Sequence, residues 1–134
     1  LVASSGYEQD SFHGMMTLDM IGRNEITTVK VGKRSSDIAL GEHISRGAEV
    51  LGLTIDEEGM ESFLDRSDQA PFLRAGIPSV FFFGGLHDDY HMPADDVEGV
   101  LPEKISNVAR LAFLTSGFMA NEAESDSDSG TASD

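Results

Sequence analysis

A short apolar run that stops at two glycines is the feature that most constrains this chain. Residues 79–83 read SVFFF, with Pro78 on one side and Gly84 and Gly85 on the other. A run of aromatic and β-branched residues with such boundaries suits a strand buried on both faces. Strands of this kind are typical of the middle of an α/β sheet. The run therefore predicts a buried strand in an α/β fold.

A dense cluster of histidine and aspartate follows that strand at once. Residues 86–96 read LHDDYHMPADD, and no other part of the chain has so many ligand-type and acid/base-type side chains. In open α/β sheets, ligands bind beyond the carboxyl ends of the strands, so this cluster is well placed for chemistry. A solvated acidic loop is the alternative that composition leaves open.

Composition excludes several classes of function. The 134 residues are 40% apolar, which is enough for one folded domain. There is no cysteine, so a metal site would use His, Asp or Glu. The net charge of −15 argues against nucleic acid as a partner, because phosphate binding needs Lys and Arg, and it also fits adaptation to high salt. No stretch approaches the roughly 20 apolar residues that span a bilayer, so a membrane partner is not expected.

A second predicted strand carries a carboxylate. Residues 14–21 read GMMTLDMI, an apolar run with Asp19 inside it. An ionised carboxylate in a buried strand is costly unless it is paired, hydrogen-bonded or bound to a metal. The alternative is an aspartate at the strand end that caps the following turn.

The middle of the chain predicts further strands and helices in alternation. Residues 25–32 predict a strand, residues 36–52 a helix, and residues 53–55 a short strand followed by a turn. Ser67 or Asp68 is expected to cap a short helix before the strand at residue 79. This alternation is typical of an α/β fold.

The last predicted helix opens at Pro102, and an acidic tail follows it. Residues 122–134 are acidic and low in complexity, which predicts a disordered tail separate from a folded part over residues 1–121. One stripe of this predicted helix consists of Ile105, Val108, Ala109, Ala112, Thr115 and Met119.

Three segments in order carry a family resemblance. TLDMIGRN (17–24), RSDQAPFLRAGIPSVFFFGG (66–85) and HDDYHMPADD (87–96) together resemble the carboxy-terminal half of the M28 family of zinc aminopeptidases. The resemblance runs from about Met15 to Asn121. It implies a three-layer α/β sandwich around a mostly parallel central sheet, of the zinc-peptidase (phosphorylase/hydrolase-like) type, of which this chain forms a part.

The resemblance also implies site residues. The aspartate of the LDM motif, here Asp19, is a ligand of one zinc in the family, and the histidine of the YH-x-P-x-D motif, here His91, is a ligand of the other. Tyr90 is similar to a hydrogen-bond donor for the oxyanion of the tetrahedral intermediate. Arg66 is similar to a residue that binds the substrate or the intermediate.

Three further residues receive supporting roles from the same resemblance. Phe83 matches an aromatic residue that lines the specificity pocket, Asp95 a carboxylate that fixes the loop or a ligand, and Asp68 a structural carboxylate. Two other histidines are interpreted differently. His87 is expected to lie on the surface, and His43 to be a surface or satisfied helix residue.

The implied function is removal of the amino-terminal residue from peptides that have a free amino end. The implied mechanism is two-metal hydrolysis, in which two zinc ions activate a water and polarise the scissile carbonyl while a glutamate acts as general base. In the family, a His-x-Asp motif and a Glu-Glu pair precede the LDM motif, and this chain has neither before Asp19. Glu57 and Glu58 come after it, in the wrong order. The chain alone is therefore expected to be inactive and to self-associate or pair with a missing amino-terminal half.

Other functions stay open at this point. The fold can serve as a non-catalytic binding or scaffold module, or carry a zinc-dependent glutaminyl cyclase or a carboxypeptidase. Because many members of the family are exported, the resemblance favours a secreted or periplasmic protein.

Overall fold

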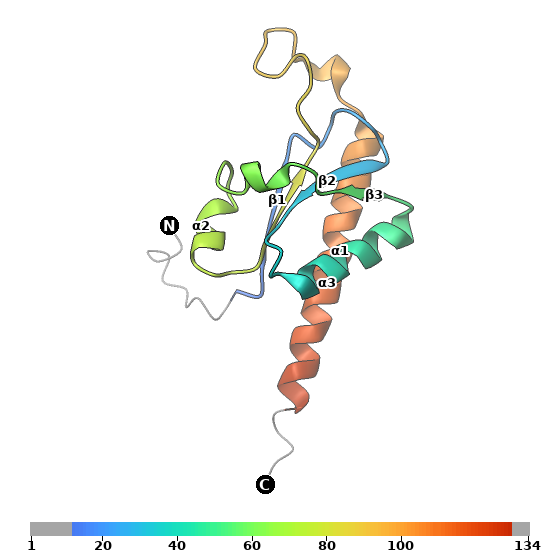
Figure 1. The fold of residues 1–134 in the computed structure, drawn as a ribbon. Helices are drawn as coiled ribbons and strands as arrows, with labels where there is room; N and C mark the ends of the chain where they lie inside the picture. The colour runs from blue at the N-terminus through green and yellow to red at the C-terminus, as the bar shows by residue number, and fades with distance from the viewer. Residues whose placement is uncertain (1–11, 130–134) are drawn as a thin grey trace.

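The computed structural model describes the backbone of residues 12–129 and the side chains of residues 12–122. From residue 28 onwards, strands and helices alternate along the chain, as the sequence predicts (Figure 1). The elements are β1 (Met15–Asp19), β2 (Thr28–Gly32), α1 (Ile38–Leu51), β3 (Thr54–Asp56), η3 (Met60–Phe63), α2 (Ala70–Arg74), β4 (Ser79–Phe83), η4 (Val97–Gly99) and α3 (Pro102–Ser129), where η marks a 3₁₀ helix.

The four strands form one mixed sheet with the order β1-β4-β2-β3. β1 runs parallel to β4 and β2 parallel to β3, whereas β4 and β2 are antiparallel. Asp19 pairs with Phe83, so the carboxyl ends of β1 and β4 lie side by side at the same end of the sheet. The expected α/β class and mostly parallel sheet are confirmed.

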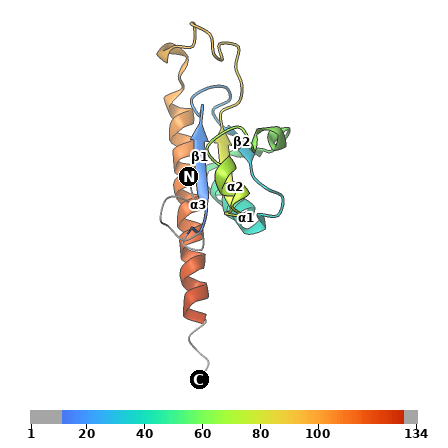
Figure 2. The ribbon, with the colours of Figure 1, turned by 90° about the vertical axis from the view of Figure 1, so that its left-hand side faces the viewer.

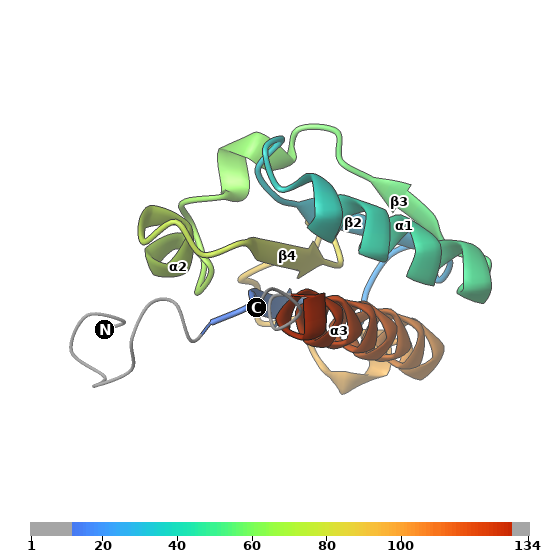
Figure 3. The ribbon, with the colours of Figure 1, turned by 90° about the horizontal axis from the view of Figure 1, so that it is seen from below.

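The larger core lies between the sheet and two helices. α1 and α3 pack side by side against one face of β2 and β4 (Figure 3). β4 lies inside the sheet and all five of its residues are buried, as the SVFFF run predicts. This core consists of Val29, Val31, Leu40, Ile44, Ala48, Val80, Phe82, Val108 and Leu111.

The second face of the sheet has a smaller aromatic core. Phe81 and Phe83 point to this side because side chains alternate along a strand, and they pack with Met60 of η3. Met20 and Phe63 cover them in part. Figure 2 shows the sheet with α3 on one side and the segment from η3 to α2 on the other. The described residues place two long helices on one face only, and the third layer of a sandwich is not established.

Helix α1 ends as its sequence predicts. Gly52 follows the last helical residue with φ 66°, and its backbone N–H donates to the carbonyls of Ala48 and Glu49. A glycine adopts this left-handed conformation without the steric cost of a side chain. The expected helix over residues 36–52 is confirmed to within two residues at its start.

The expected cap of helix α2 is wrong. The helix begins at Ala70, Gln69 occupies the N-cap position, and no side chain caps it. The Ser67 hydroxyl instead donates to the Asp19 carboxylate, at 3.1 Å. Ser67 therefore binds a residue distant in sequence and does not cap the helix that follows it.

The buried stripe of α3 also differs from the expected one. Lys104, Val108, Leu111 and Thr115 are buried, whereas Ile105 is 37% exposed. A hydropathy pattern places lysine on the exposed face of a helix. Lys104 is buried instead, because its ammonium donates to two backbone carbonyls. Residues 122–129, expected to be disordered, continue α3 as helix, because each residue added to an existing helix gains a backbone bond. Residues 130–134 lie outside the described part.

Strand β1 forms one edge of the sheet. In the part of the chain that the structure describes, it pairs with β4 alone. Leu18 is 40% exposed, and Phe113 of α3 is 76% exposed. A hollow of about 450 Å³ runs between β1 and α3 beside these residues, lined largely by apolar side chains. An apolar surface is therefore exposed along β1. None of the described helices is long and apolar enough to cross a membrane.

Candidate functional site

The two predicted metal ligands lie on segments that leave the sheet at the same end, where β1 and β4 stop. Asp19 ends β1 and lies opposite Phe83, which ends β4. The backbone N–H of Gly84 then donates to the Asp19 carbonyl at 3.3 Å. A Cβ on Gly84 would lie 1.9 Å from the Met20 carbonyl oxygen, so only glycine fits where the chain leaves β4. This close crossing places the start of the His91 segment directly over the end of β1.

Asp19 is held by the sheet and by one hydroxyl. Its side chain is partly buried, and Oδ2 accepts the hydrogen bond from Ser67. The cost of a carboxylate in an apolar strand is thus met by hydrogen bonding. The following residue, Met20, has φ 53°, which turns the chain away from the sheet at once.

His91 lies on a loop that projects beyond the sheet. We call residues 84–101 the histidine loop, drawn in yellow to orange at the top of Figure 1. His91 is exposed and adopts φ 59°, a left-handed conformation that is uncommon for a residue with a side chain. The ring of Tyr90, which is 39% exposed, stacks on the His91 ring at 3.9 Å between centroids. Both side chains are accessible from solvent.

Asp95 is bound by an arginine from the β1–β2 connection. The Arg23 guanidinium forms an ion pair with Asp95 and lies 3.9 Å from the Asp89 carboxylate. Arg23 also donates to the backbone carbonyl of Asp96 at 3.2 Å. Asp95 is thus tied to the β1–β2 connection, and the role that the resemblance implies for it stays a prediction.

The interpretation of His87 as a surface residue is wrong. Its side chain is only 9% exposed, and Nε2 lies 3.7 Å from the Asp95 carboxylate. Its ring meets the Tyr90 ring edge-on at 6.4 Å. Nδ1 is buried and has no hydrogen-bond partner among the described residues. The residues around it bury the imidazole, which the polar sequence of this segment does not reveal.

The other predicted site residues are dispersed. Arg66 is exposed and lies over the Phe63 ring, at 5.1 Å. Asp68 is exposed and forms no side-chain hydrogen bond or ion pair with another described residue. Phe83 is 3% exposed, with its ring stacked on Phe81 at 5.1 Å, so in this structure it belongs to the smaller core. The predicted roles of these three residues stay predictions.

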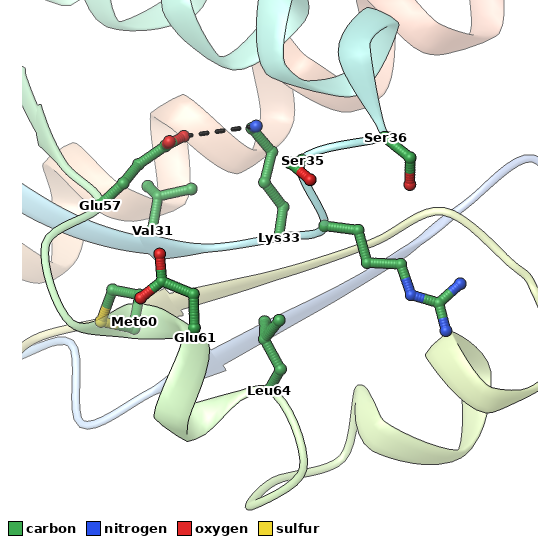
Figure 4. Close-up of a pocket in the computed structure, with 9 residues that line it drawn as sticks. Val31, Lys33, Ser35, Ser36, Glu57, Met60, Glu61 and Leu64 are labelled. Carbon is green, nitrogen blue, oxygen red and sulfur yellow. Dashed lines mark ion pairs between the residues drawn. The ribbon is translucent and has the colours of Figure 1, made fainter.

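His43 and the glutamate pair have structural partners. His43 is 7% exposed, and its Nε2 lies 2.9 Å from the Glu122 carboxylate, so it is a satisfied helix residue as expected. Glu57 forms an ion pair with Lys33 at 3.5 Å in a pocket of about 440 Å³ that contains none of the predicted site residues (Figure 4). The backbone N–H of Glu58 donates to Asp56.

The described residues do not complete a metal site. Asp19 offers a carboxylate and His91 an imidazole, which are both good zinc ligands. Within residues 12–122, however, no three His, Asp or Glu side chains are grouped closely enough to hold one ion. Protein zinc sites use three or four protein ligands. Asp19 and His91 suit zinc chemically, but a zinc site that used either of them would need further ligands than the described residues provide.

The buried Lys104 side chain forms hydrogen bonds with the β1–β2 connection. The Lys104 ammonium of α3 donates to the carbonyls of Glu25 and Thr28. Burial lowers the pKa of Lys104, and the nearby Glu25 carboxylate opposes this shift. The residue is 1% exposed. The connection that follows Asp19 is thus fixed to the core by a charged group.

Sequence reasoning missed three residues around this site. Ser67 binds Asp19, Arg23 binds the histidine loop, and the Asn24 amide donates to the carbonyls of Gly84 and Leu86. Arg23 and Asn24 close the TLDMIGRN segment, so a signal was present in the sequence. Nothing in one sequence tells that these side chains reach residues about 60 to 70 positions away.

Comparison with known proteins agrees with the motifs. The family model described as peptidase family M28 matches residues 1–116 of the chain. No curated protein and no solved structure matches this sequence. The family match covers most of the 134 residues and includes β1, β4 and the histidine loop, so the chain belongs to peptidase family M28.

Proposed function

We propose that this chain supplies one side of a two-zinc aminopeptidase site, with Asp19 as a ligand of one ion and His91 as a ligand of the other. One observation carries the proposal. β1 and β4 are adjacent parallel strands whose carboxyl ends meet, and the residue that ends β1 and the loop that follows β4 are the two predicted ligand positions. This is the edge at which α/β sheets bind ligands.

The local contacts favour metal binding by these two side chains. The Ser67 hydroxyl restricts rotation of the Asp19 carboxylate through the bond to Oδ2, so the other carboxylate oxygen has a defined direction. His91 is exposed, and an imidazole can coordinate a metal ion through a ring nitrogen. Zinc bound there would supply a Lewis acid for the scissile carbonyl and lower the pKa of a bound water.

Two side chains are proposed to act on the substrate. The Tyr90 hydroxyl is a neutral donor on the residue next to His91, and it is accessible from solvent. We expect it to donate a hydrogen bond to the oxyanion that forms as the peptide bond breaks. Arg66 carries a permanent positive charge, lies one residue before the serine that binds Asp19, and would bind a substrate carbonyl or the same oxyanion.

The substrate class follows from charge. The amino end of a peptide is a cation, and the histidine loop carries Asp88 and Asp89 beside Tyr90. The whole chain has a net charge of −15, which attracts cationic ligands and repels polyanions. A peptide with a free amino end fits this field better than an amino-blocked one.

The remaining ligands and the general base are proposed to come from another part of the complete protein. The β1 edge and the hollow beside Leu18 and Phe113 form an unpaired apolar surface of the described chain, where further strands of the domain would pack. Without that partner the chain would self-associate. Export to the periplasm or the medium is part of the proposal.

Zinc content and turnover of the complete protein test the proposal. Purified protein is assayed for zinc by mass spectrometry and for release of the first residue from peptides with free or acetylated amino ends. We expect cleavage of free amino ends only. The variants Asp19→Asn and His91→Asn are each expected to lose about one zinc per protein and at least 100-fold in turnover.

Two control variants separate this result from a general loss of charge. Asp65→Asn removes a carboxylate that is 85% exposed, and His13→Asn removes an exposed imidazole. Both are expected to retain zinc and activity. Unchanged zinc and unchanged turnover in Asp19→Asn and His91→Asn would contradict the proposal.

A non-catalytic module is the second candidate, because no group of three metal-binding side chains occurs among the described residues. A complete protein that binds peptides with free amino ends, contains no zinc and turns over no substrate would favour it. Release of the last residue instead of the first would indicate a carboxypeptidase. Cyclisation of an amino-terminal glutamine would indicate a glutaminyl cyclase.

A further inference from the structure

The connection between β1 and β2 contacts both ends of the histidine loop. The Gly22 carbonyl accepts a hydrogen bond from the Leu101 N–H at 2.8 Å. The Asn24 amide donates to the Gly84 carbonyl at 2.8 Å and to the Leu86 carbonyl at 3.2 Å. The function proposed above uses none of these contacts. A tripeptide that begins three residues after Asp19 thus fixes where the histidine loop starts and where it ends.

Arg23 lies between these two anchors and contacts the middle of the loop. Its guanidinium forms an ion pair with Asp95, lies 3.9 Å from Asp89, and donates to the Asp96 carbonyl at 3.2 Å. The side chain is 15% exposed. A Cβ on Gly99 would lie 1.4 Å from the Arg23 Nη1 atom, so the absence of a side chain there makes room for the guanidinium.

The loop needs such a contact for two reasons. It carries five acidic residues within eleven positions, and these repel one another: Asp88, Asp89, Asp95, Asp96 and Glu98. His91 is also held at φ 59°, a conformation that costs free energy unless its surroundings impose it. Among the described residues, Arg23 is the one arginine or lysine that forms ion pairs with this loop.

We propose that Arg23 is a positioning residue that fixes Tyr90 and His91 relative to Asp19. This inference rests on the function proposed above and extends it to a residue that contacts neither metal nor substrate. Arg23 acts through Asp95, which lies four residues after His91 and also faces the buried His87 ring. The connection that carries Arg23 begins at the end of β1, directly after Asp19. Arg23 therefore links the position of His91 on the loop to the position of Asp19 on the sheet.

The connection that carries Arg23 is hydrogen-bonded to helix α3. Lys104 of α3 donates to the Glu25 and Thr28 carbonyls directly after the tripeptide. Asn24 adopts φ 65°, and asparagine tolerates this conformation better than most residues do. Arg23 therefore extends from a fixed support towards an exposed loop.

Four variants of the complete protein test this role. Arg23→Met removes the charge and keeps a long apolar side chain. Arg23→Lys keeps the charge but loses the planar two-pronged donor. Gly99→Ala keeps the arginine and displaces its guanidinium. Arg74→Met is the matched control, since it removes an arginine that is 65% exposed and pairs with Asp65 away from the loop.

The first readout does not need activity. In zinc-free protein with ¹³C-labelled histidine, the His91 ring signal, assigned by its loss in His91→Asn, carries a ring-current shift from the Tyr90 stack. We expect Arg23→Met and Gly99→Ala to move this signal towards the position of a free histidine. Arg23→Lys should fall between, and Arg74→Met should not change it. An unmoved signal in both Arg23→Met and Gly99→Ala overturns the inference.

The second readout separates positioning from general stability. We expect kcat to fall by about 10-fold to 100-fold in Arg23→Met and Gly99→Ala, with KM changed less than about 3-fold and partial recovery in Arg23→Lys. A loss confined to thermal stability, with normal kcat per zinc-loaded protein, would overturn the role in catalysis. If the complete protein has no peptidase activity, the proposed function fails, and the histidine signal still decides whether Arg23 fixes the loop.

Discussion

The two sides of the candidate site are built differently. Asp19 ends a strand whose neighbour, β4, is completely buried, and its carboxylate has a hydroxyl partner. His91 lies on an exposed loop, adopts a left-handed backbone conformation, and has an exposed aromatic neighbour. The sheet positions the first side chain, whereas side-chain contacts from another connection position the loop that carries the second.

This difference predicts different responses to substitution. The sheet side depends on close packing, where added atoms collide with backbone that cannot move. The loop side depends on a few polar contacts and on tolerated backbone strain. Changes on the sheet side should therefore alter folding, and changes on the loop side should alter the site with little effect on folding.

The largest expected effect is at the point where the two sides meet. Gly84→Ala should lower the free energy of unfolding by about 3 kcal/mol or more, because its Cβ would lie 1.9 Å from the Met20 carbonyl oxygen. Gly117→Ala is the control, since its Cβ meets nothing within 4 Å and alanine favours a helix; it should stabilise by about 0.5–1 kcal/mol. Urea denaturation measures both. Equal stability of Gly84→Ala and the parent would show that the crossing is not tight.

The next effect concerns the support beneath the Arg23 connection. Lys104→Met should lower the free energy of unfolding by about 2 kcal/mol, because the Glu25 and Thr28 carbonyls lose their donor. Burial sets the pKa of Lys104 below its ordinary value of 10.5, so the folded state releases this proton at a lower pH than the unfolded state does. The parent should therefore gain stability as pH rises towards 10.5 and lose it as pH falls through the lowered pKa.

Chemical denaturation of both proteins from pH 7 to pH 10.5 measures this term. The variant should lack the stability that the parent gains in this window. Parallel pH profiles would mean that the Lys104 ammonium has an ordinary pKa and is not desolvated.

A smaller effect tests the strain at His91. His91→Ala and His91→Gly both remove the imidazole, but only glycine adopts φ 59° freely. The glycine variant should be more stable than the alanine variant by about 1 kcal/mol. At Glu49, an exposed position of helix α1, the order should reverse. Thermal denaturation of the four variants measures this, and the same order at both positions would remove the argument for strain.

The smallest effect lies at the far edge of the sheet. The Lys30 ammonium donates to Asp56 at 2.6 Å, and this bond, followed by the one from the Glu58 N–H, lowers the pKa of Asp56. The resulting stability is present above pH 3.8 and is lost as pH falls through the lowered pKa. Both side chains are about one-third exposed, so the term should be about 0.5 kcal/mol. Acid titration of Asp56→Asn, with Asp65→Asn as control, measures it; equal acid sensitivity of the parent and Asp56→Asn would exclude this term.

The local sequence pattern was sufficient to predict an element where hydrophobicity or glycine conformation alone determines it. The SVFFF run between proline and glycines predicts a strand that the structure buries completely, and the helix predicted over residues 36–52 ends at Gly52 with positive φ. These features follow from side-chain hydrophobicity and from the freedom of glycine. The motif order also sufficed for the family, which the match over residues 1–116 confirms.

Local pattern failed where a polar side chain has a distant partner. Ser67 is expected to cap a helix and binds Asp19 instead, 48 residues away. Lys104 is buried because two backbone carbonyls accept its ammonium protons. The His87 side chain is only 9% exposed and lies beside Asp95, although two aspartates follow it in sequence. In each case the energy of a hydrogen bond or ion pair depends on a group that local sequence does not identify.

The sequence by itself determined the α/β class, the family, and the two residues expected to bind metal, because hydrophobic runs, glycines and motif order are local properties. Only the tertiary structure decided that Asp19 is held by Ser67 and the histidine loop by Arg23, and that the described residues do not complete a metal site. The physical reason is that directional polar contacts act over a few ångströms in space, between residues about 50 to 70 positions apart in the chain.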